Sequence, residues 1–267
     1  MSQPTVTGQL KALEHELGVP LFTRKAHGVV LTPLGQKLLS TATSVIATLD
    51  DFVQSTRAQS GSVGRKLRVG MIVNPEFLRL GQITSLVRTR RPEIELEFHQ
   101  SLSNLIRRDI QRRELDGGFF LGAVQQGTVN AIHLTAVEFR VIAPAAWKRQ
   151  VEGASWQDLA RLPWVCTPKG GAFRKLSNRF FRRHNMKPAT VTETDRESTI
   201  LNLVAAGVGL SLVRADALPV NSRRPGAILQ LPGSITTGLY FLFAAGRQDD
   251  AALIALVDAV RAAWKRQ

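Results

Sequence analysis

The sequence of 267 residues contains one cysteine, one tyrosine and 6% aromatic residues, and it is short of acidic groups. With Cys166 alone, the chain can form neither an internal disulfide nor a cysteine metal cluster, so we expect this thiol to be a small core residue. No apolar run approaches the roughly 18 residues that a membrane-spanning helix needs. We therefore expect a cytoplasmic protein with no membrane partner.

The shortage of acidic residues leaves a formal net charge of +14, from 35 basic and 21 acidic residues. Residues 1–61 carry five basic and four acidic residues, whereas the remainder carries 30 and 17. The excess of positive charge therefore lies behind the front segment and is no argument for DNA contact there. We expect most of it to be solvated surface, including Arg107, Arg108, Arg112 and Arg113.

The front segment, SQPTVTGQLKALEHELGVPLF over residues 2–22, has the pattern of an amphipathic helix. Ser2 can cap its start, Pro4 is tolerated in the first turn, and Gly18 is a plausible stop. The spacing of four, three, four and four places five apolar residues on one face: Val6, Leu10, Leu13, Leu17 and Leu21.

The next stretch, LFTRKAHGVVLT, reads as a hairpin that turns between Lys25 and Gly28. Thr32 and Pro33 then predict the start of a second helix. Apolar positions on this helix follow a heptad-like seam, which favours pairing with another helix over docking on the chain's own globular part. The seam consists of Leu34, Leu38, Ala42, Val45, Leu49, Phe52 and Thr56.

The glycine-rich stretch SGSVGR, residues 60–65, predicts a domain boundary. Strand and helix patterns alternate after it, which indicates an α/β fold with a parallel or mixed sheet. Two β-rich stretches, residues 132–144 and 238–244, are candidates for two crossings between a pair of subdomains. The last helix, over residues 249–264, would return to the first subdomain.

The run SQPTVTGQLKALEHELGVPLFTRKAHGVVLTPLG resembles the second half of the winged helix-turn-helix of LysR-type transcriptional regulators. The rest of the chain, through LVAAGVGLSLV, is similar to that family's effector-binding domain. The resemblance implies a partial winged helix-turn-helix over residues 1–33, a linker helix over 34–61, and a two-subdomain, periplasmic-binding-protein-like effector domain over 62–267. Subdomain I would hold residues 62–143 and 245–267, and subdomain II residues 144–244.

By this resemblance the front helix is a recognition helix in the major groove of double-stranded promoter DNA. The DNA-contacting residues that it implies are Ser2, Gln3, Pro4, Thr5, Thr7 and Gln9 on the helix, with Arg24, Lys25 and His27 on the hairpin. The linker helix would pair two subunits into a homodimer or a homotetramer. The family has two further helices before this one, so we expect the sequence to be N-terminally incomplete.

The stretch TPKGGAFRKL, residues 167–176, joins a strand to a helix and offers free amides for an anion, with Lys169 close by; the alternative is an ordinary tight turn. The resemblance implies an effector between the subdomains, and we expect a small carboxylate or other anion. Where many family members have Ser or Thr, this chain has Asn74 and Pro75. The implied effector-binding residues are Asn74, Pro75, Thr167, Gly171, Phe173, Val213 and Arg214.

Several other kinds of chemistry find no support in the sequence. The stretch AAGVGLSL follows a helix and precedes a strand, the reverse of a dinucleotide fingerprint. The five histidines lack metal spacing, and no serine or cysteine lies in a nucleophile motif. We therefore expect no cofactor, no metal and no enzyme.

These patterns together predict a LysR-type, DNA-binding transcriptional regulator whose promoter binding responds to a small-molecule effector. Two alternatives stay open at this point. One is a stand-alone small-molecule binding protein, and the other is a truncated regulator fragment that pairs with full-length relatives and inactivates them.

Overall fold

The computed structural model describes residues 3–25, 28–59, 65–72, 74–124, 129–169, 171–218, 227–247 and 249–265. Internal contacts divide the chain into two compact units. One unit, here the front unit, holds Met1–Val63 together with Arg112–Glu114. The other, here the main unit, holds Gly64–Gln111 and Leu115–Gln267.

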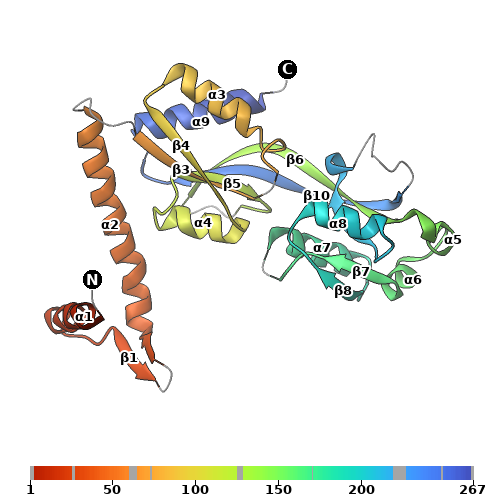
Figure 1. Ribbon diagram of the computed structural model, residues 1–267, viewed down its shortest axis with the longest axis horizontal. Coiled ribbons are helices and arrows are strands. Elements are labelled where there is room, and N and C mark those ends of the chain that lie inside the picture. Colours follow the sequence, from red (N-terminus) through yellow and green to blue (C-terminus); the bar gives the residue numbers. More distant parts are fainter. Residues whose placement is uncertain are drawn as a thin grey trace. The chain divides into compact units, whose positions relative to one another are not determined.

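The front unit consists of two helices and a hairpin (Figure 1). Gly18 has a positive φ of 67°, which ends the first helix before Leu21, so that Leu21 lies beyond the helix rather than on its stripe. The predicted hairpin is an antiparallel pair. The elements are α1 (Gln3–Leu17), β1 (Phe22–Lys25), β2 (Gly28–Leu31) and α2 (Pro33–Gln59).

The loop between α1 and the hairpin is held by hydrogen bonds to α1 and packs closely on the start of α2. The Glu14 carboxylate accepts the amides of Leu21 and Phe22 at 2.7 and 2.8 Å. Thr32 caps α2 by accepting the Gly35 amide at 2.9 Å, as its sequence position predicts. A Cβ on Gly35 would lie 2.2 Å from the Leu21 carbonyl oxygen, so only glycine fits this close approach.

The main unit is built around a mixed six-stranded sheet in the order β4-β3-β5-β10-β6-β9. A separate parallel pair, β7-β8, is connected by an isolated bridge from Trp164 to Leu210, the residue before β9. We call β3, α3, β4, α4, β5 and α9 the first lobe, and α5 to α8 with β7 to β9 the second lobe. The bounds are β3 (Arg65–Met71), α3 (Leu80–Arg90), β4 (Ile94–Gln100), α4 (Ser103–Gln111), β5 (Gly117–Leu121), β6 (Val129–Pro144), α5 (Lys148–Val151), α6 (Trp156–Arg161), β7 (Pro163–Cys166), α7 (Ala172–Arg183), β8 (Ala189–Glu193), α8 (Glu197–Ala205), β9 (Ser211–Arg214), β10 (Ile228–Ala244) and α9 (Ala251–Trp264).

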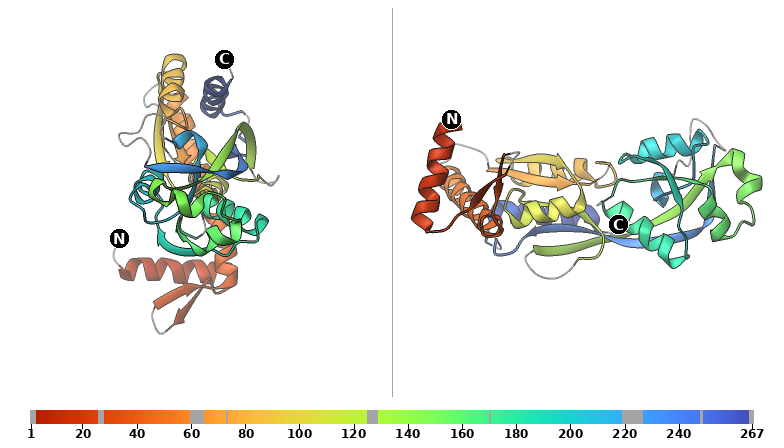
Figure 2. Two further views of the ribbon diagram at one scale, coloured as in Figure 1. Left: turned by 90° about the vertical axis from the view of Figure 1, so that its right-hand side faces the viewer. Right: turned by 90° about the horizontal axis from the view of Figure 1, so that it is seen from below.

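Two long strands, β6 and β10, belong to both lobes (Figures 1 and 2). They pair antiparallel from Ile228 opposite Pro144 to Ala244 opposite Val129. One end of β10 pairs with β5 of the first lobe, while β6 pairs with β9 of the second. The register shifts twice, between Gln230 and Ser234 and between Leu239 and Tyr240. The two β-rich stretches of the sequence are thus one continuous ribbon.

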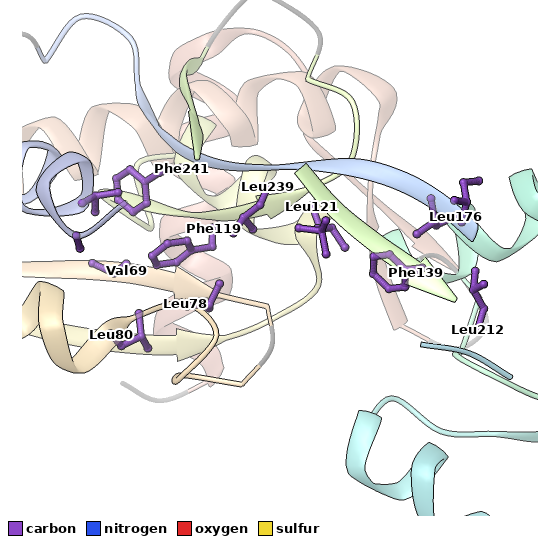
Figure 3. Packing of buried hydrophobic residues seen from close by; sticks show 14 of the residues in the cluster. Val69, Leu78, Leu80, Phe119, Leu121, Phe139, Leu176, Leu212, Leu239 and Phe241 are labelled. Carbon is purple, nitrogen blue, oxygen red and sulfur yellow. The ribbon is translucent and has the colours of Figure 1, made fainter. Parts of the chain in front are cut away.

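The hydrophobic core follows this ribbon from one lobe into the other (Figure 3). Near β5, the rings of Phe119 and Phe241 pack edge to face with centroids 5.2 Å apart. Farther along, Phe139 of β6 lies in the same buried cluster as Leu212 of β9. Because one cluster serves both lobes, the fold of each lobe depends on the same two strands.

The central strand β5 does not show a strand pattern in the sequence, because it begins with two glycines. A Cβ on Gly117 would lie 2.7 Å from the Phe241 ring, and one on Gly118 would lie 2.6 Å from Ile106. Close packing therefore selects residues of poor strand propensity at the middle of the sheet. Helix α3 begins only at Leu80, because residues 75–79 form turns that end with Arg79 at φ 56°.

A buried ion-pair network joins the start of β3 to the start of α9. Asp250 accepts Arg247 and Arg65 on Oδ2, the latter at 2.6 Å, and its Oδ1 caps α9. Arg247 also donates to Asp116 at 2.5 Å, and Asp116 in turn accepts the Arg68 amide at 2.6 Å. This network fixes the first strand after the predicted domain boundary to the last helix of the chain.

Candidate functional site

The predicted DNA-contacting residues lie on α1 and on the hairpin of the front unit. Thr7 and Gln9 are exposed on α1. Ser2 and His27 lie outside the described residues, and so do the side chains of Gln3, Pro4, Thr5, Arg24 and Lys25. The backbone of residues 3–5 forms the first turn of α1, and residues 24–25 end β1. Their roles in DNA binding stay predictions.

The predicted effector-binding residues lie around a cavity of about 440 Å³ in the main unit, here the effector cavity. The first lobe contributes the loop after β3 and the end of β4. The second lobe contributes the end of β7, the start of α7, the residues that open α8, and β9. The lining residues are Ile72, Asn74, Pro75, Glu76, Gln100, Thr167, Phe173, Asp195, Arg196, Glu197, Ser198, Ile200, Leu212 and Val213.

Five of the seven predicted effector residues line this cavity: Asn74, Pro75, Thr167, Phe173 and Val213. The other two do not. Gly171 is the N-cap residue of α7 and is buried, and a Cβ built there would lie 3.6 Å from Leu102. Arg214 is buried and lies outside the lining, next in sequence to the lining residue Val213. Whether these residues bind an effector stays a prediction.

Thr167 and Phe173 give the cavity a polar point and an apolar wall. The Thr167 hydroxyl oxygen is buried and has no hydrogen-bond partner among the described residues. The Phe173 ring packs edge to face on Phe139, with centroids 5.3 Å apart, which holds it against the core. A buried hydroxyl without a partner costs free energy, so such a group is commonly retained for a ligand or a water.

Arg214 connects the second lobe to the first through an aromatic stack. Its guanidinium carbon lies 3.7 Å from the centroid of the Phe77 ring, and the Phe77 ring packs edge to face on Trp264 at 6.2 Å. The guanidinium of Arg79 lies over the Trp264 ring, 4.5 Å from its centroid. Because Phe77 follows the cavity loop and Trp264 ends α9, this stack couples the cavity wall to the last helix.

The sequence reasoning missed the carboxylates of the cavity. Glu76, Asp195 and Glu197 all line it, against one arginine, Arg196. Burial raises the pKa of Glu197 above its ordinary value, although Arg214, at 3.2 Å, opposes the shift. The signal that could have found them is their place at the helix start: Glu197 is the first residue of α8, and Asp195 precedes it by two.

The described residues contain no group of three or more His, Cys, Asp or Glu side chains placed to hold a metal ion. In the same residues, no helix is both long enough and apolar enough to span a bilayer.

Two family models match the chain. The model of the LysR substrate binding domain matches residues 60–265. The model of the bacterial regulatory helix-turn-helix protein of the lysR family matches residues 1–36. Together they cover the main unit and the front part of the chain.

Two curated relatives align with most of this chain. The transcriptional regulator YofA of Bacillus velezensis is 27% identical over 231 residues, which cover 86% of this chain and 78% of the relative. A probable hydrogen peroxide-inducible genes activator of Streptomyces viridosporus is 28% identical over 233 residues, 86% of this chain and 74% of the relative.

Solved structures show the same fold. A full-length OxyR variant from Pseudomonas aeruginosa superposes with a TM-score of 0.66 at 24% identity and covers 98% of this chain and 86% of its own. Full-length CbnR in complex with its target DNA gives a TM-score of 0.64 at 19% identity, over 98% of this chain and 91% of its own.

Proposed function

The chain belongs to the LysR family of transcriptional regulators, and from this premise we propose that a ligand in the effector cavity controls how the protein holds promoter DNA in the cytoplasm. As a member of this family it is a DNA-binding regulator with an effector-binding domain, not an enzyme. The match at both ends of the chain favours this function over a stand-alone binding protein. The observation that carries the proposal is the cavity itself, which draws residues from both lobes.

The polar groups of the cavity suggest the chemistry of the effector. Thr167 presents a buried hydroxyl without a partner in the described residues, and Ser198 and Arg196 add a hydroxyl and a positive charge. These groups suit a carboxylate or another anionic group. Glu76 and Asp195 on the same lining suit a hydrogen-bond donor or a cation. We therefore propose a small organic acid that also carries a donor group, as in an amino-acid-like zwitterion.

A peroxide-sensing function is named for one relative but is not our proposal for this chain. A thiol–disulfide switch within one chain needs two cysteines, and this chain has one, Cys166, which is buried. The effector cavity offers the alternative route to regulation, because a ligand that prefers one arrangement of the two lobes shifts the population toward it.

The effector proposal is tested by a thermal-shift screen of monocarboxylates, dicarboxylates and amino acids. A ligand at a hundred times its dissociation constant adds about 2.7 kcal/mol, which raises the melting temperature of a domain of this size by about 5–10 °C. Thr167→Ala and Phe173→Ala should reduce the shift, whereas Thr89→Ala, on the exposed face of α3, should leave it unchanged. Equal shifts in all three variants would place the ligand elsewhere.

The coupling to DNA is tested with the ligand found in that screen. Footprinting of the promoter should show a changed pattern of protection when the ligand is added. An identical pattern with and without a ligand that stabilises the protein would contradict control of DNA binding, even though ligand binding itself would stand.

For the DNA contacts, we propose that Thr7 and Gln9 read bases together with the residues before them on α1. A good base contact contributes about 1–3 kcal/mol of discrimination. Gln9→Ala should therefore weaken binding to the promoter about tenfold or more, while binding to a scrambled duplex changes little. Glu16→Gln, exposed at the other end of α1, is the matched control. Equal loss on both duplexes would show a phosphate contact instead.

For assembly, we propose that α2 pairs two subunits, in a homodimer or in a homotetramer that contains it. Val45, Ile46 and Leu49 are 55%, 61% and 58% exposed, so three large apolar side chains lie on the surface of this helix. Leu49→Asp should give a monomer by light scattering at micromolar concentration, and Thr41→Asp should not. A monomeric wild-type protein under the same conditions would refute the pairing of two subunits.

A further inference from the structure

A second cavity of the main unit, about 480 Å³ in volume, lies between α4 and α7 and is here the basic cavity. Helix α4 contributes residues of its first two turns, β5 its end, and α7 one face. It shares no lining residue with the effector cavity. The lining residues are Ser103, Asn104, Arg107, Phe120, Leu121, Gly122, Ala123, Ala172, Lys175, Leu176, Arg179, Arg182 and Thr237.

The charge of the basic cavity is all of one sign. Arg107, Lys175, Arg179 and Arg182 line it, and none of the lining residues, which all belong to the described part of the chain, is acidic. The effector cavity, by contrast, has three carboxylates and one arginine. Four like charges around one hollow repel one another, and an anion between them relieves that repulsion.

Lys175, Arg179 and Arg182 are exposed to solvent, and they differ from other surface charges in that they line one hollow. Arg179 donates to the Thr236 carbonyl oxygen at 2.8 Å, which anchors its side chain at the cavity wall. The floor is apolar, with Leu121 and Leu176 buried. On the same helix, Arg174 is neutralised by Glu193 at 3.1 Å and does not line the cavity. What Arg107, Lys175, Arg179 and Arg182 share is therefore that they line the same hollow.

We propose that the basic cavity binds a small anion with at least two negative charges, such as a phosphorylated or a polycarboxylated metabolite, as a ligand separate from the effector. A volume of this size is typical of small-molecule sites. Duplex DNA is convex and needs an open surface, so the hollow favours a small polyanion over a nucleic acid. Because α4 belongs to the first lobe and α7 to the second, the ligand contacts both lobes at once.

Isothermal titration calorimetry at constant ionic strength tests this proposal with two probes. Citrate represents the polycarboxylated ligands, and pyrophosphate represents the phosphorylated ones. The double variant Lys175→Gln/Arg182→Gln should lose about tenfold or more in affinity, because charge-assisted hydrogen bonds are among the strong ones. The matched control is Arg183→Gln/Lys187→Gln. Arg183 and Lys187 are exposed, as Lys175 and Arg182 are, but lie outside the lining, so this variant should stay within about twofold of wild type.

Two further measurements locate the binding. Citrate or pyrophosphate should protect Lys175 from acetylation more than Lys187, and Thr167→Ala in the effector cavity should leave the affinity unchanged. Equal loss in the two double variants would overturn the proposal as general charge attraction. A loss in Thr167→Ala would overturn it by placing the anion in the effector cavity, and unmeasurable binding of both probes to the wild type would also overturn it.

Discussion

Asp250 joins two kinds of interaction that a single substitution can separate. Its Oδ2 accepts Arg247 and Arg65, while its Oδ1 accepts the amides of Ala252 and Leu253 at 3.1 and 3.2 Å at the start of α9. Asparagine is as good an N-cap as aspartate, so Asp250→Asn keeps the cap but removes the ion pairs, because its amide nitrogen is uncharged and cannot accept the hydrogen bonds of Arg247 and Arg65. Asp250→Ala removes both.

The size of each effect follows from these contacts. Hydrogen bonds to charged groups contribute about 1.5–3 kcal/mol, and Arg247 keeps Asp116 as a partner, so we expect Asp250→Asn to cost about 2 kcal/mol. Loss of an N-cap costs about 1 kcal/mol more, so Asp250→Ala should cost about 3 kcal/mol. For a domain of this size, these values correspond to falls in melting temperature of about 4–8 °C and 6–12 °C.

The pH dependence of the free energy of unfolding shows whether the charge of Asp250 stabilises the fold. Burial raises the pKa of Asp250, but the hydrogen bonds and charges of Arg247 and Arg65 outweigh it and hold the pKa below its ordinary value. A carboxyl with a lowered pKa stabilises the fold above its unfolded-state pKa and loses that contribution as the pH falls through its folded-state pKa. The gap between the wild type and Asp250→Asn should therefore be constant near neutral pH and close below about pH 4.

Urea unfolding at pH 7, 5 and 3 measures these differences, with Asp258→Asn, exposed on the same helix, as the control. Two results would refute the reasoning. One is equal cost for the asparagine and alanine variants, which would mean that the cap contributes nothing. The other is a gap that persists unchanged below pH 4, which would mean that the charge of Asp250 is not its source.

Three further substitutions test other parts of the fold. Gly35→Ala should lower the melting temperature of the front unit, because its Cβ would meet the Leu21 carbonyl oxygen at 2.2 Å; calorimetry showing an unchanged transition would contradict this close approach. Thr167→Val should stabilise the free protein by about 1 kcal/mol in urea unfolding, because it removes a buried hydroxyl that has no partner among the described residues, while it weakens effector binding. Glu197→Gln should gain stability relative to the wild type as the pH rises from 4 to 7, because burial raises the pKa of Glu197. A carboxyl with a raised pKa loses its contribution to the stability of the fold as it ionises. A change in the opposite direction would show that Arg214 outweighs burial.

Local patterns were sufficient to predict much of the fold. The front helix with Gly18 as its stop, the hairpin, the Thr32 cap and the long helix after it all follow from short-range chemistry, and the structure confirms them. What could not be predicted depends on contacts distant in sequence. Strand β5 is an example, because its two glycines make sense only beside Phe241 and Ile106.

The same distinction applies to the candidate sites. Thr167 and Phe173 could be nominated from a resemblance, and both line the effector cavity. The stack of Arg214 on Phe77 could not, since it brings together the end of β9 and a turn far before it in the chain. Nor could the basic cavity, because Arg107 was expected to be plain solvated surface and only the fold places it near Arg179.

The shared ribbon of β6 and β10 limits how the two lobes can move. Two strands hydrogen-bonded from Val129 to Pro144 cannot slide past one another without breaking their ladder, whereas they can twist or bend at modest cost. Two irregular steps interrupt the ladder, one between Gln230 and Ser234 and the other between Leu239 and Tyr240. We therefore expect a ligand in either cavity to change the angle between the two lobes by twisting or bending this ribbon, without breaking the pairing of β6 with β10.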